Sequence, residues 1–246
     1  MKEKFKQHKR GIYLLPNLFT TASLFAAFYS IVSSMHQQFE IAAIAIFIGM
    51  ITDSLDGRVA RITNTQTAFG AEYDSLSDMV TFGIAPSLLA YNWSLHLLGK
   101  FGWLVAFVYT ASVALRLARF NTQLGVSNKR YFQGLACPSG AAIIASLVWV
   151  GQSFPLSNEY LSIYFAIIAI LIATLMVSNI RYHSFKDIDV KGKVPFLHIL
   201  LLVIIFVAIA LNPAWMILIT FSLYALSGPI LTLIRLRKVK KREKQK

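Results

Sequence analysis

Residues 160–178 read YLSIYFAIIAILIATLMVS, and residues 196–211 read FLHILLLVIIFVAIAL. Neither run contains Asp, Glu, Lys or Arg, and each approaches the roughly 20 apolar residues that a helix needs to cross a bilayer. Of all 246 residues, 56% are hydrophobic and 14% are charged, with a mean hydropathy of +0.59. A soluble domain carries about 25% charged residues. The sequence therefore predicts an all-α integral membrane protein and excludes a soluble enzyme or binding module.

The apolar pattern divides the chain into about eight spans separated by short loops rich in Pro, Gly and Asn. Inside the hydrocarbon no water competes for backbone groups, so each span should be a helix that satisfies its own hydrogen bonds. The expected spans are 14–34, 39–60, 72–97, 101–121, 137–154, 159–179, 194–211 and 214–235.

The cations predict the orientation of these spans. The N-terminus, three alternate loops and the tail from Arg235 hold 23 of the 24 Lys and Arg residues, and the opposite loops hold only Lys100. The positive-inside rule then places both termini on the cytoplasmic side of the cell membrane. We expect the basic tail to lie on anionic lipid headgroups rather than on nucleic acid, which no other feature favours.

Four aspartates fall within residues 53–78, DSLDGRVARITNTQTAFGAEYDSLSD, although the whole chain has only 11 acidic residues. Asp53 and Asp56 are three residues apart and Asp74 and Asp78 are four apart, so each pair shares one helix face. Such carboxylates repel each other unless a cation neutralises them, and Mg²⁺ binds carboxylates together with substrate phosphates. We therefore expect metal-dependent phosphoryl chemistry at the cytoplasmic interface.

Small residues and one arginine accompany the aspartates. Gly57, Ala60 and Arg61 follow Asp53 at helical spacing, and Gly70 lies one turn before Asp74. The small residues would leave room for a bulky flat group, and the guanidinium fork suits phosphate oxygens. Two other interpretations stay open at this point: aspartates that carry protons or cations in an ion-coupled transporter, and polar residues that cap helices or reach the interface.

The spacing D-x2-D-G-x2-A-R-x8-G-x3-D-x3-D from Asp53 to Asp78 resembles the signature of the CDP-alcohol phosphotransferase family. The resemblance implies transfer from a CDP-linked donor to an alcohol with release of CMP, with two divalent ions, Mg²⁺ or Mn²⁺. It implies that all four aspartates bind metal and that Asp78 is also the general base. By the same resemblance Gly57, Ala60, Arg61 and Gly70 would line the donor site, and the protein would be a homodimer.

Four other stretches resemble the membrane-embedded phosphatidylserine synthases of bacteria and archaea. They are LPNLFTT (15–21), DSLSDMVTFGIAP (74–86), ALRLARFN (114–121) and FQGLACPSGAA (132–142). This implies that CDP-diacylglycerol is the donor and the hydroxyl of L-serine the acceptor. Enzymes for glycerol 3-phosphate and inositol phosphate share the aspartate motif, so these acceptors remain alternatives. The resemblance implies a six-helix core in residues 1–180, followed by two further spans and a basic tail in 181–246.

Serine would bring a carboxylate to the site, and two arginines are candidates to bind it. Arg116 and Arg119 lie three apart near the cytoplasmic end of the fourth span, with Asn121 and Lys129 nearby. A charge at this depth needs a partner. Either arginine could bind the carboxylate, or both could extend to lipid phosphates.

Three residues elsewhere interrupt the regular helix pattern. Asn17 and Thr20 lie three apart in the first span; they are suited to cap a helix, and the resemblance implies that they bind the donor. Pro86 lies inside the third span and should free the carbonyl of Phe82 and kink the helix there.

Overall fold

The computed structural model describes residues 14–123, 131–152, 159–183 and 210–243, with the single positions 203 and 207. Helices occupy seven of the eight predicted spans within these ranges; the span 194–211 lies almost entirely outside the described residues. The elements are α2 (Leu14–Met35), α3 (Phe39–Ile62), α4 (Ala68–Asp78), η1 (Met79–Ile84), α5 (Ala85–Trp93), η2 (Leu95–Leu98), α6 (Lys100–Gln123), β1 (Tyr131–Gln133), α7 (Cys137–Gly151), α8 (Glu159–Val177), β2 (Arg181–His183) and α10 (Pro213–Glu243).

Four helices in the described ranges are long and apolar enough to cross a membrane, namely α2, α6, α8 and α10. The helix α3 is of similar length at 24 residues, but its second half carries two aspartates and two arginines. The apolar helix α7 has only 15 residues. These lengths and compositions support a helical membrane protein, as the sequence predicts.

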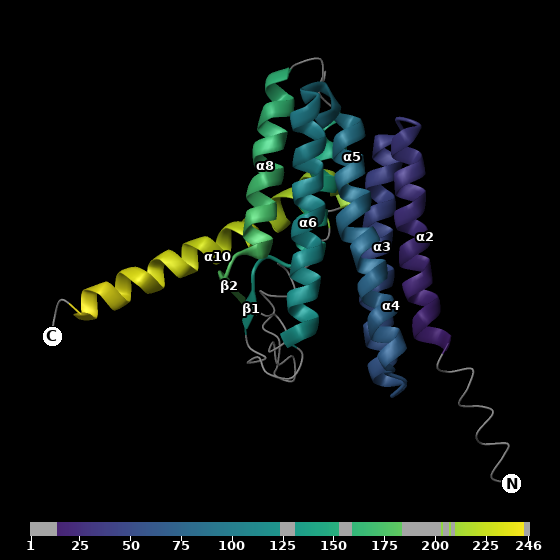
Figure 1. Cartoon of the computed structure of the whole chain (residues 1–246), viewed down its shortest axis with the longest axis horizontal. Coiled ribbons are helices and arrows are strands. Elements are labelled where there is room, and N and C mark those ends of the chain that lie inside the picture. Colours follow the sequence, from purple (N-terminus) through teal and green to yellow (C-terminus); the bar gives the residue numbers. More distant parts are fainter. Residues whose placement is uncertain are drawn as a thin grey trace, which may run out of the picture.

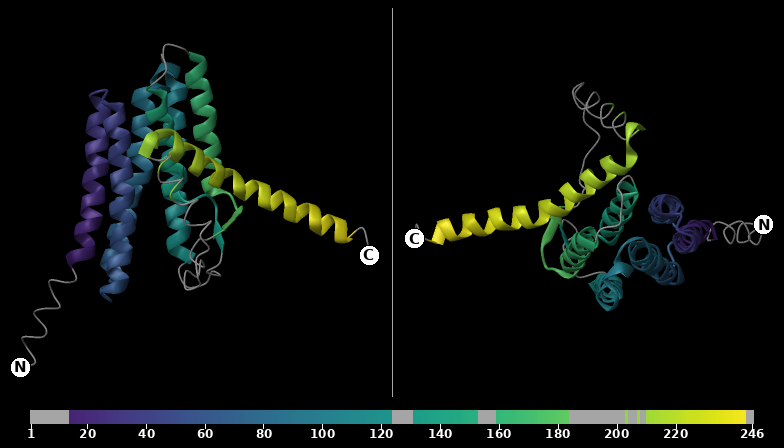
Figure 2. Two further views of the ribbon diagram at one scale, coloured as in Figure 1. Left: turned by 180° about the vertical axis from the view of Figure 1, so that it is seen from behind. Right: turned by 90° about the horizontal axis from the view of Figure 1, so that it is seen from above.

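The helices α2, α3, α5, α6 and α8 run roughly alongside one another, whereas α10 is steeply inclined to them (Figures 1 and 2). The end of α3, all of α4 and the end of α6 lie at one end of this bundle, the lower end in Figure 1. The short strands β1 and β2 lie toward the same end. The acidic stretch is therefore gathered at a single end of the bundle.

Two strands of three residues each accompany the helices and leave the predicted all-α class unchanged. β1 pairs antiparallel with β2, with Phe132 opposite Tyr182. Gly134 follows β1 with φ 75°, and a Cβ there would lie 2.2 Å from the carbonyl oxygen of Met176. Its N–H donates to the carbonyl of Ile180 at 2.8 Å. The segments that enter α7 and leave α8 thus pair their backbone groups with each other instead of with water.

The helix α7 lies at the centre of the packing. Most of its side chains are buried, and it contacts α3, α5, α8 and α10. Small residues allow close approach elsewhere: a Cβ on Gly49 of α3 would lie 2.9 Å from Cγ2 of Thr81 in η1. The third predicted span is not one continuous α-helix, because the π-helical segment η1 separates α4 from α5.

Candidate metal and substrate site

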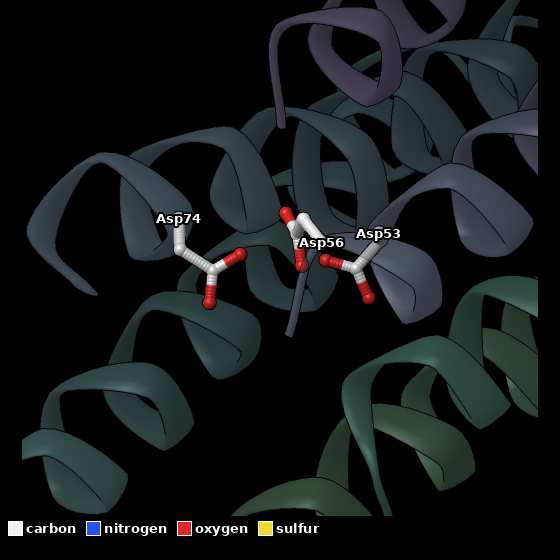
Figure 3. A group of neighbouring side chains, drawn as sticks. All are labelled: Asp53, Asp56 and Asp74. Atoms are coloured by element: carbon white, nitrogen blue, oxygen red, sulfur yellow. The ribbon is translucent and has the colours of Figure 1, made fainter. Parts of the chain in front are cut away.

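Asp53 and Asp56 of α3 lie close to Asp74 of α4 (Figure 3). One carboxylate oxygen from each of Asp53, Asp56 and Asp74 lies within 4.8 Å of the other two. Asp56 is 6% exposed and the other two are half-buried. Three carboxylates this close and this poorly hydrated need positive charge between them, and oxygen ligands of this kind suit a hard divalent cation.

Asp78 is next to this group without being part of the triple contact. Its carboxyl group lies within hydrogen-bonding reach of Asp53, and that of Asp74 within reach of Asp56. The Oδ1 atoms of Asp74 and Asp78 are buried and have no hydrogen-bond partner among the described residues. Buried polar atoms are normally paired. Two unpaired carboxylate oxygens beside three other carboxylates therefore fit a cation site.

The helix α2 holds the two acidic helices in register. The hydroxyl of Thr20 donates to Oδ2 of Asp56 at 2.7 Å, and Ser77 donates to the carbonyl of Thr20 at 3.2 Å. Thr20 is 3% exposed. Thr20 lies inside α2 and does not cap that helix; its hydroxyl orients a carboxylate of the cluster, and the donor contact suggested by the sequence stays a prediction. The hydrogen bond between Thr20 and Asp56 joins residues 36 apart in sequence, so no local pattern predicts it.

One side of the aspartate cluster is lined by short side chains. A Cβ built on Gly57 would meet no described atom within 4 Å, and Ala60 is half-buried. Arg61 is exposed, and its Nε donates to the carbonyl of Gly57 at 2.8 Å, which leaves its other nitrogens available. Gly70 is close to Asn17: a Cβ on Gly70 would lie 3.4 Å from the Oδ1 of Asn17. The predicted donor residues of α3, α4 and α2 are thus neighbours of the aspartates.

Thr67 is a residue of this region that the sequence analysis missed. It is the N-cap of α4, and its side chain accepts a hydrogen bond from the N–H of Gly70 at 3.0 Å. A Cβ on Gly70 would lie 3.1 Å from the Thr67 Oγ1. The signal was present, because threonine directly before a helical run is a common N-cap.

The two candidate arginines of α6 differ in their surroundings. Arg119 donates to the carbonyl of Val177 at 3.0 Å and to Oδ1 of Asn179 at 3.2 Å, so it holds the end of α8. Arg116 donates to the Sγ of Cys137 at 3.4 Å, and its buried Nε has no hydrogen-bond partner in the described ranges. The Cys137 thiol is close enough to interact electrostatically with both Arg116 and Asp78.

Asn121 is connected to the acidic helix by a direct contact. Its Nδ2 donates to the hydroxyl of Ser75 at 3.0 Å, and Ser75 is the neighbour of Asp74 in α4. Lys129 lies outside the described residues. Of these four candidates for serine binding, Arg116 therefore has a buried Nε without a partner among the described residues. Arg119 already donates to the end of α8.

Comparisons with known proteins agree with this geometry. The profile of the family described as CDP-alcohol phosphatidyltransferase matches residues 13–175. A CDP-diacylglycerol–serine O-phosphatidyltransferase of Helicobacter pylori strain 26695 is 36% identical over 228 residues, covering 93% of this chain and 94% of its own. Enzymes of the same name from Methanocaldococcus jannaschii and Bacillus subtilis are 39% and 34% identical, over 58% and 70% of this chain and 63% and 91% of theirs. The chain belongs to the CDP-alcohol phosphatidyltransferase family.

Proposed function

We propose that this protein transfers the phosphatidyl group of CDP-diacylglycerol to the hydroxyl of L-serine, giving phosphatidylserine and CMP. The observation that carries the proposal is the set of four carboxylates, two of whose oxygens are buried and have no partner among the described residues. The relatives that bear the name of this reaction include one that matches over 93% of the chain, which supports serine over glycerol 3-phosphate or inositol phosphate.

Asp53, Asp56, Asp74 and Asp78 would hold two divalent ions, Mg²⁺ or Mn²⁺. Bound there, such ions neutralise the pyrophosphate and polarise the phosphorus that is attacked. The chain supplies the positions of these ligands: Thr20 of α2 orients Asp56 of α3, and α4, which Thr67 caps, packs on α2 as well.

Asp78 is the proposed general base. Its Oδ1 has no partner in the described part of the chain, which supports this role, because a base must have a lone pair free for the incoming proton. As the serine oxygen bonds to phosphorus and the bond from phosphorus to CMP breaks, the hydroxyl proton passes to Asp78. The metal-binding and proton-accepting roles of Asp78 can use its two oxygens separately.

The donor and acceptor would approach from different sides of the aspartates. The cytidine nucleotide would lie on the side of Gly57, Ala60 and Arg61, where a Cβ on Gly57 meets no described atom within 4 Å, with Asn17 and Gly70 at its edge. Arg116 is the proposed ligand of the serine carboxylate, because its Nε is buried without a partner among the described residues, whereas Arg119 donates to Val177 and Asn179. Asn121 would hold α4 and α6 together beside the acceptor.

The membrane arrangement is proposed from the cation distribution. The chain would cross the cell membrane eight times, with both termini and the active site facing the cytoplasm. The core would end near residue 180, and residues 181–246 would add two spans and a basic tail. A homodimer is proposed on the family resemblance alone.

The test supplies purified protein with CDP-diacylglycerol, Mg²⁺ or Mn²⁺, and a panel of alcohols. We expect CMP release with serine, a phosphatidylserine product, and no release once the metal has been stripped with EDTA. Product with glycerol 3-phosphate or inositol phosphate instead would move the protein to another branch of the family. Ion-coupled flux in liposomes without CMP release would support the transporter.

A further inference from the structure

The segment that follows Asp78 is unusual. Residues Met79–Ile84 form one π-helical stretch, in which the N–H of Ala85 donates to the carbonyl of Val80, five residues earlier. π-Turns inside α-helices are rare and are found mostly at functional sites. This one begins at the residue after the last aspartate of the cluster.

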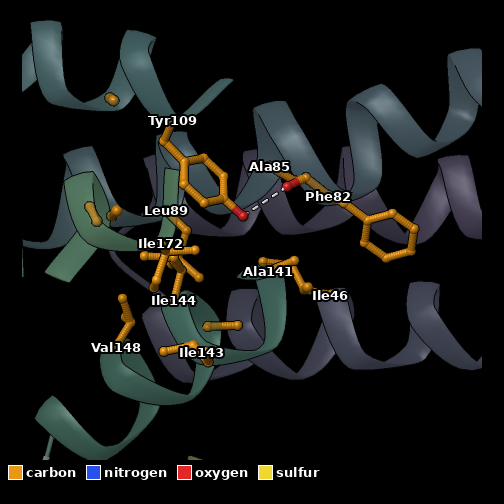
Figure 4. Close-up of a cluster of buried hydrophobic side chains, with 14 of the residues drawn as sticks. Ile46, Phe82, Ala85, Leu89, Tyr109, Ala141, Ile143, Ile144, Val148 and Ile172 are labelled. Atoms are coloured by element: carbon orange, nitrogen blue, oxygen red, sulfur yellow. Dashed lines mark hydrogen bonds between the residues drawn. The ribbon is translucent and has the colours of Figure 1, made fainter. Parts of the chain in front are cut away.

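Pro86 accounts for part of this geometry. In a regular α-helix the N–H of residue 86 would donate to the carbonyl of Phe82, but proline has no N–H. The hydroxyl of Tyr109 in α6 donates to this carbonyl at 3.0 Å (Figure 4). Tyr109 is 2% exposed and Phe82 is fully buried, so the contact is sheltered from water. The carbonyl of Phe82, which the sequence expected Pro86 to free, is therefore paired with a side chain of another helix.

The π-turn changes the direction in which the aspartates point. It holds one residue more per turn than an α-helix, so the helix before it is rotated by about 100° relative to an uninterrupted helix. The helix α5 after the turn is fixed, because Ala85, Leu89 and Ala90 are buried in the core. Without the π-turn, Asp74 and Asp78 would point about 100° away from their present direction, and hence away from Asp53.

We propose that Tyr109 is a positioning residue, whose hydrogen bond to Phe82 maintains the π-turn and so directs Asp74 and Asp78 toward Asp53 and Asp56. The proposal rests on the proposed function only in taking the aspartates as metal ligands. Tyr109 itself has no contact with substrate or metal in this role.

The first experiment replaces Tyr109 with phenylalanine, which removes the hydroxyl and keeps the ring. Residues that orient metal ligands typically contribute about 10–100-fold to metal affinity or activity. We expect Mn²⁺ affinity, measured by electron paramagnetic resonance without substrate, to fall about tenfold or more, and kcat to fall with it. Unchanged Mn²⁺ affinity would overturn the proposal.

Tyr182→Phe is the matched control. The hydroxyl of Tyr182 is also buried and also donates to a backbone carbonyl, that of Ala225 at 2.9 Å. We expect a similar loss of thermal stability but unchanged Mn²⁺ affinity. Equal loss of Mn²⁺ affinity in both variants would mean that Tyr109 acts through general stability, and would overturn the proposal.

Pro86→Ala distinguishes two roles of Tyr109: positioning the aspartates, or only supplying a hydrogen bond to the carbonyl of Phe82. The substitution restores a backbone donor for the carbonyl of Phe82, so a regular helix can form. If Tyr109 only satisfies that carbonyl, Pro86→Ala should restore both Tm and Mn²⁺ affinity to Tyr109→Phe. We expect Tm to recover and Mn²⁺ affinity to stay low, because a regular helix rotates the aspartates away; recovery of both would overturn the proposal. The protein could release no CMP while its Mn²⁺ affinity still falls in Tyr109→Phe. That result would reject the proposed function and leave this inference standing.

Discussion

The two sides of the aspartate cluster are built differently. On one side, Gly57, Ala60 and Gly70 present almost no side chain, and Arg61 is exposed. On the other, Tyr109 and Cys137 are buried, and Arg116 keeps a buried nitrogen that is unpaired among the described residues. The proposed donor, a nucleotide with a lipid attached, would need the room of the first side. The second side could select a small amino acid, because a buried polar group there stays without a hydrogen bond until the amino acid binds. Shape would thus select the donor and polarity the acceptor.

Asp78 lies between the two sides, and its loss should have the largest effect. Asp78→Asn keeps the shape but removes the free basic oxygen, so kcat should fall by roughly 10²–10⁴-fold. Binding of CDP-diacylglycerol should survive better, because Asp53, Asp56 and Asp74 still meet. Asp56→Asn is the comparison and should damage donor binding and turnover together. Near-normal turnover in Asp78→Asn at saturating serine and metal would place the base elsewhere.

Gly57 tests whether the open side admits the donor. Gly57→Val would fill space that the nucleotide is proposed to occupy, and a side chain forced into occupied space costs about 1–3 kcal/mol. We expect kcat/KM for CDP-diacylglycerol to fall roughly 5- to 150-fold, with little change in the KM for serine. Gly57→Ala should have a smaller effect and a slightly more stable helix. Equal activity of the valine variant would remove the nucleotide from this side.

The two arginines of α6 test the acceptor side. A hydrogen bond to a charged group contributes about 1.5–3 kcal/mol, so Arg116→Lys should raise the KM for serine by roughly 10- to 100-fold. Arg119→Lys should leave that KM unchanged and lower Tm, because Arg119 holds Val177 and Asn179 at the end of α8. If the two variants exchange these phenotypes, the serine carboxylate is bound by Arg119.

Thr20 should give the smallest effect. Thr20→Val removes the hydroxyl that donates to Asp56 but leaves the carboxylate in place. One hydrogen bond contributes about 0.5–1.5 kcal/mol net, so Mn²⁺ affinity should fall roughly 2- to 12-fold. Thr20→Ser keeps the hydroxyl and should therefore keep the Mn²⁺ affinity of the unaltered protein. A loss as large as that of Asp56→Asn would mean that Thr20 itself contacts the metal or the donor.

Local patterns account for the helices and the aspartates. A span of apolar residues has few other structures available in a membrane, and the predicted bounds of α2, α3, α6 and α8 agree with the structure within about two residues. Aspartates three and four apart share a face in any helix. These features depend on neighbours in sequence, which the sequence displays directly.

Long-range contacts account for what the sequence did not predict. Arg116 and Arg119 are equivalent by spacing, and their roles differ because Cys137 and Val177 approach from other helices. Pro86 predicted a kink, but the π-turn also requires Tyr109, which lies 27 residues from its partner. The strands β1 and β2 have three residues each, too short for an alternating pattern to be recognised.

The shortness of α7 couples the site to membrane thickness. Its 15 residues span about 22 Å, against a hydrocarbon layer of about 30 Å. Because other helices enclose α7, lipid does not have to match its length. Cys137 and Arg116 would therefore lie below the headgroups, at a depth that the proposed acceptor, a water-soluble amino acid, would have to reach and that the proposed lipid donor would already occupy. Thicker bilayers should consequently weaken the apparent affinity for the acceptor while leaving that for the donor unchanged.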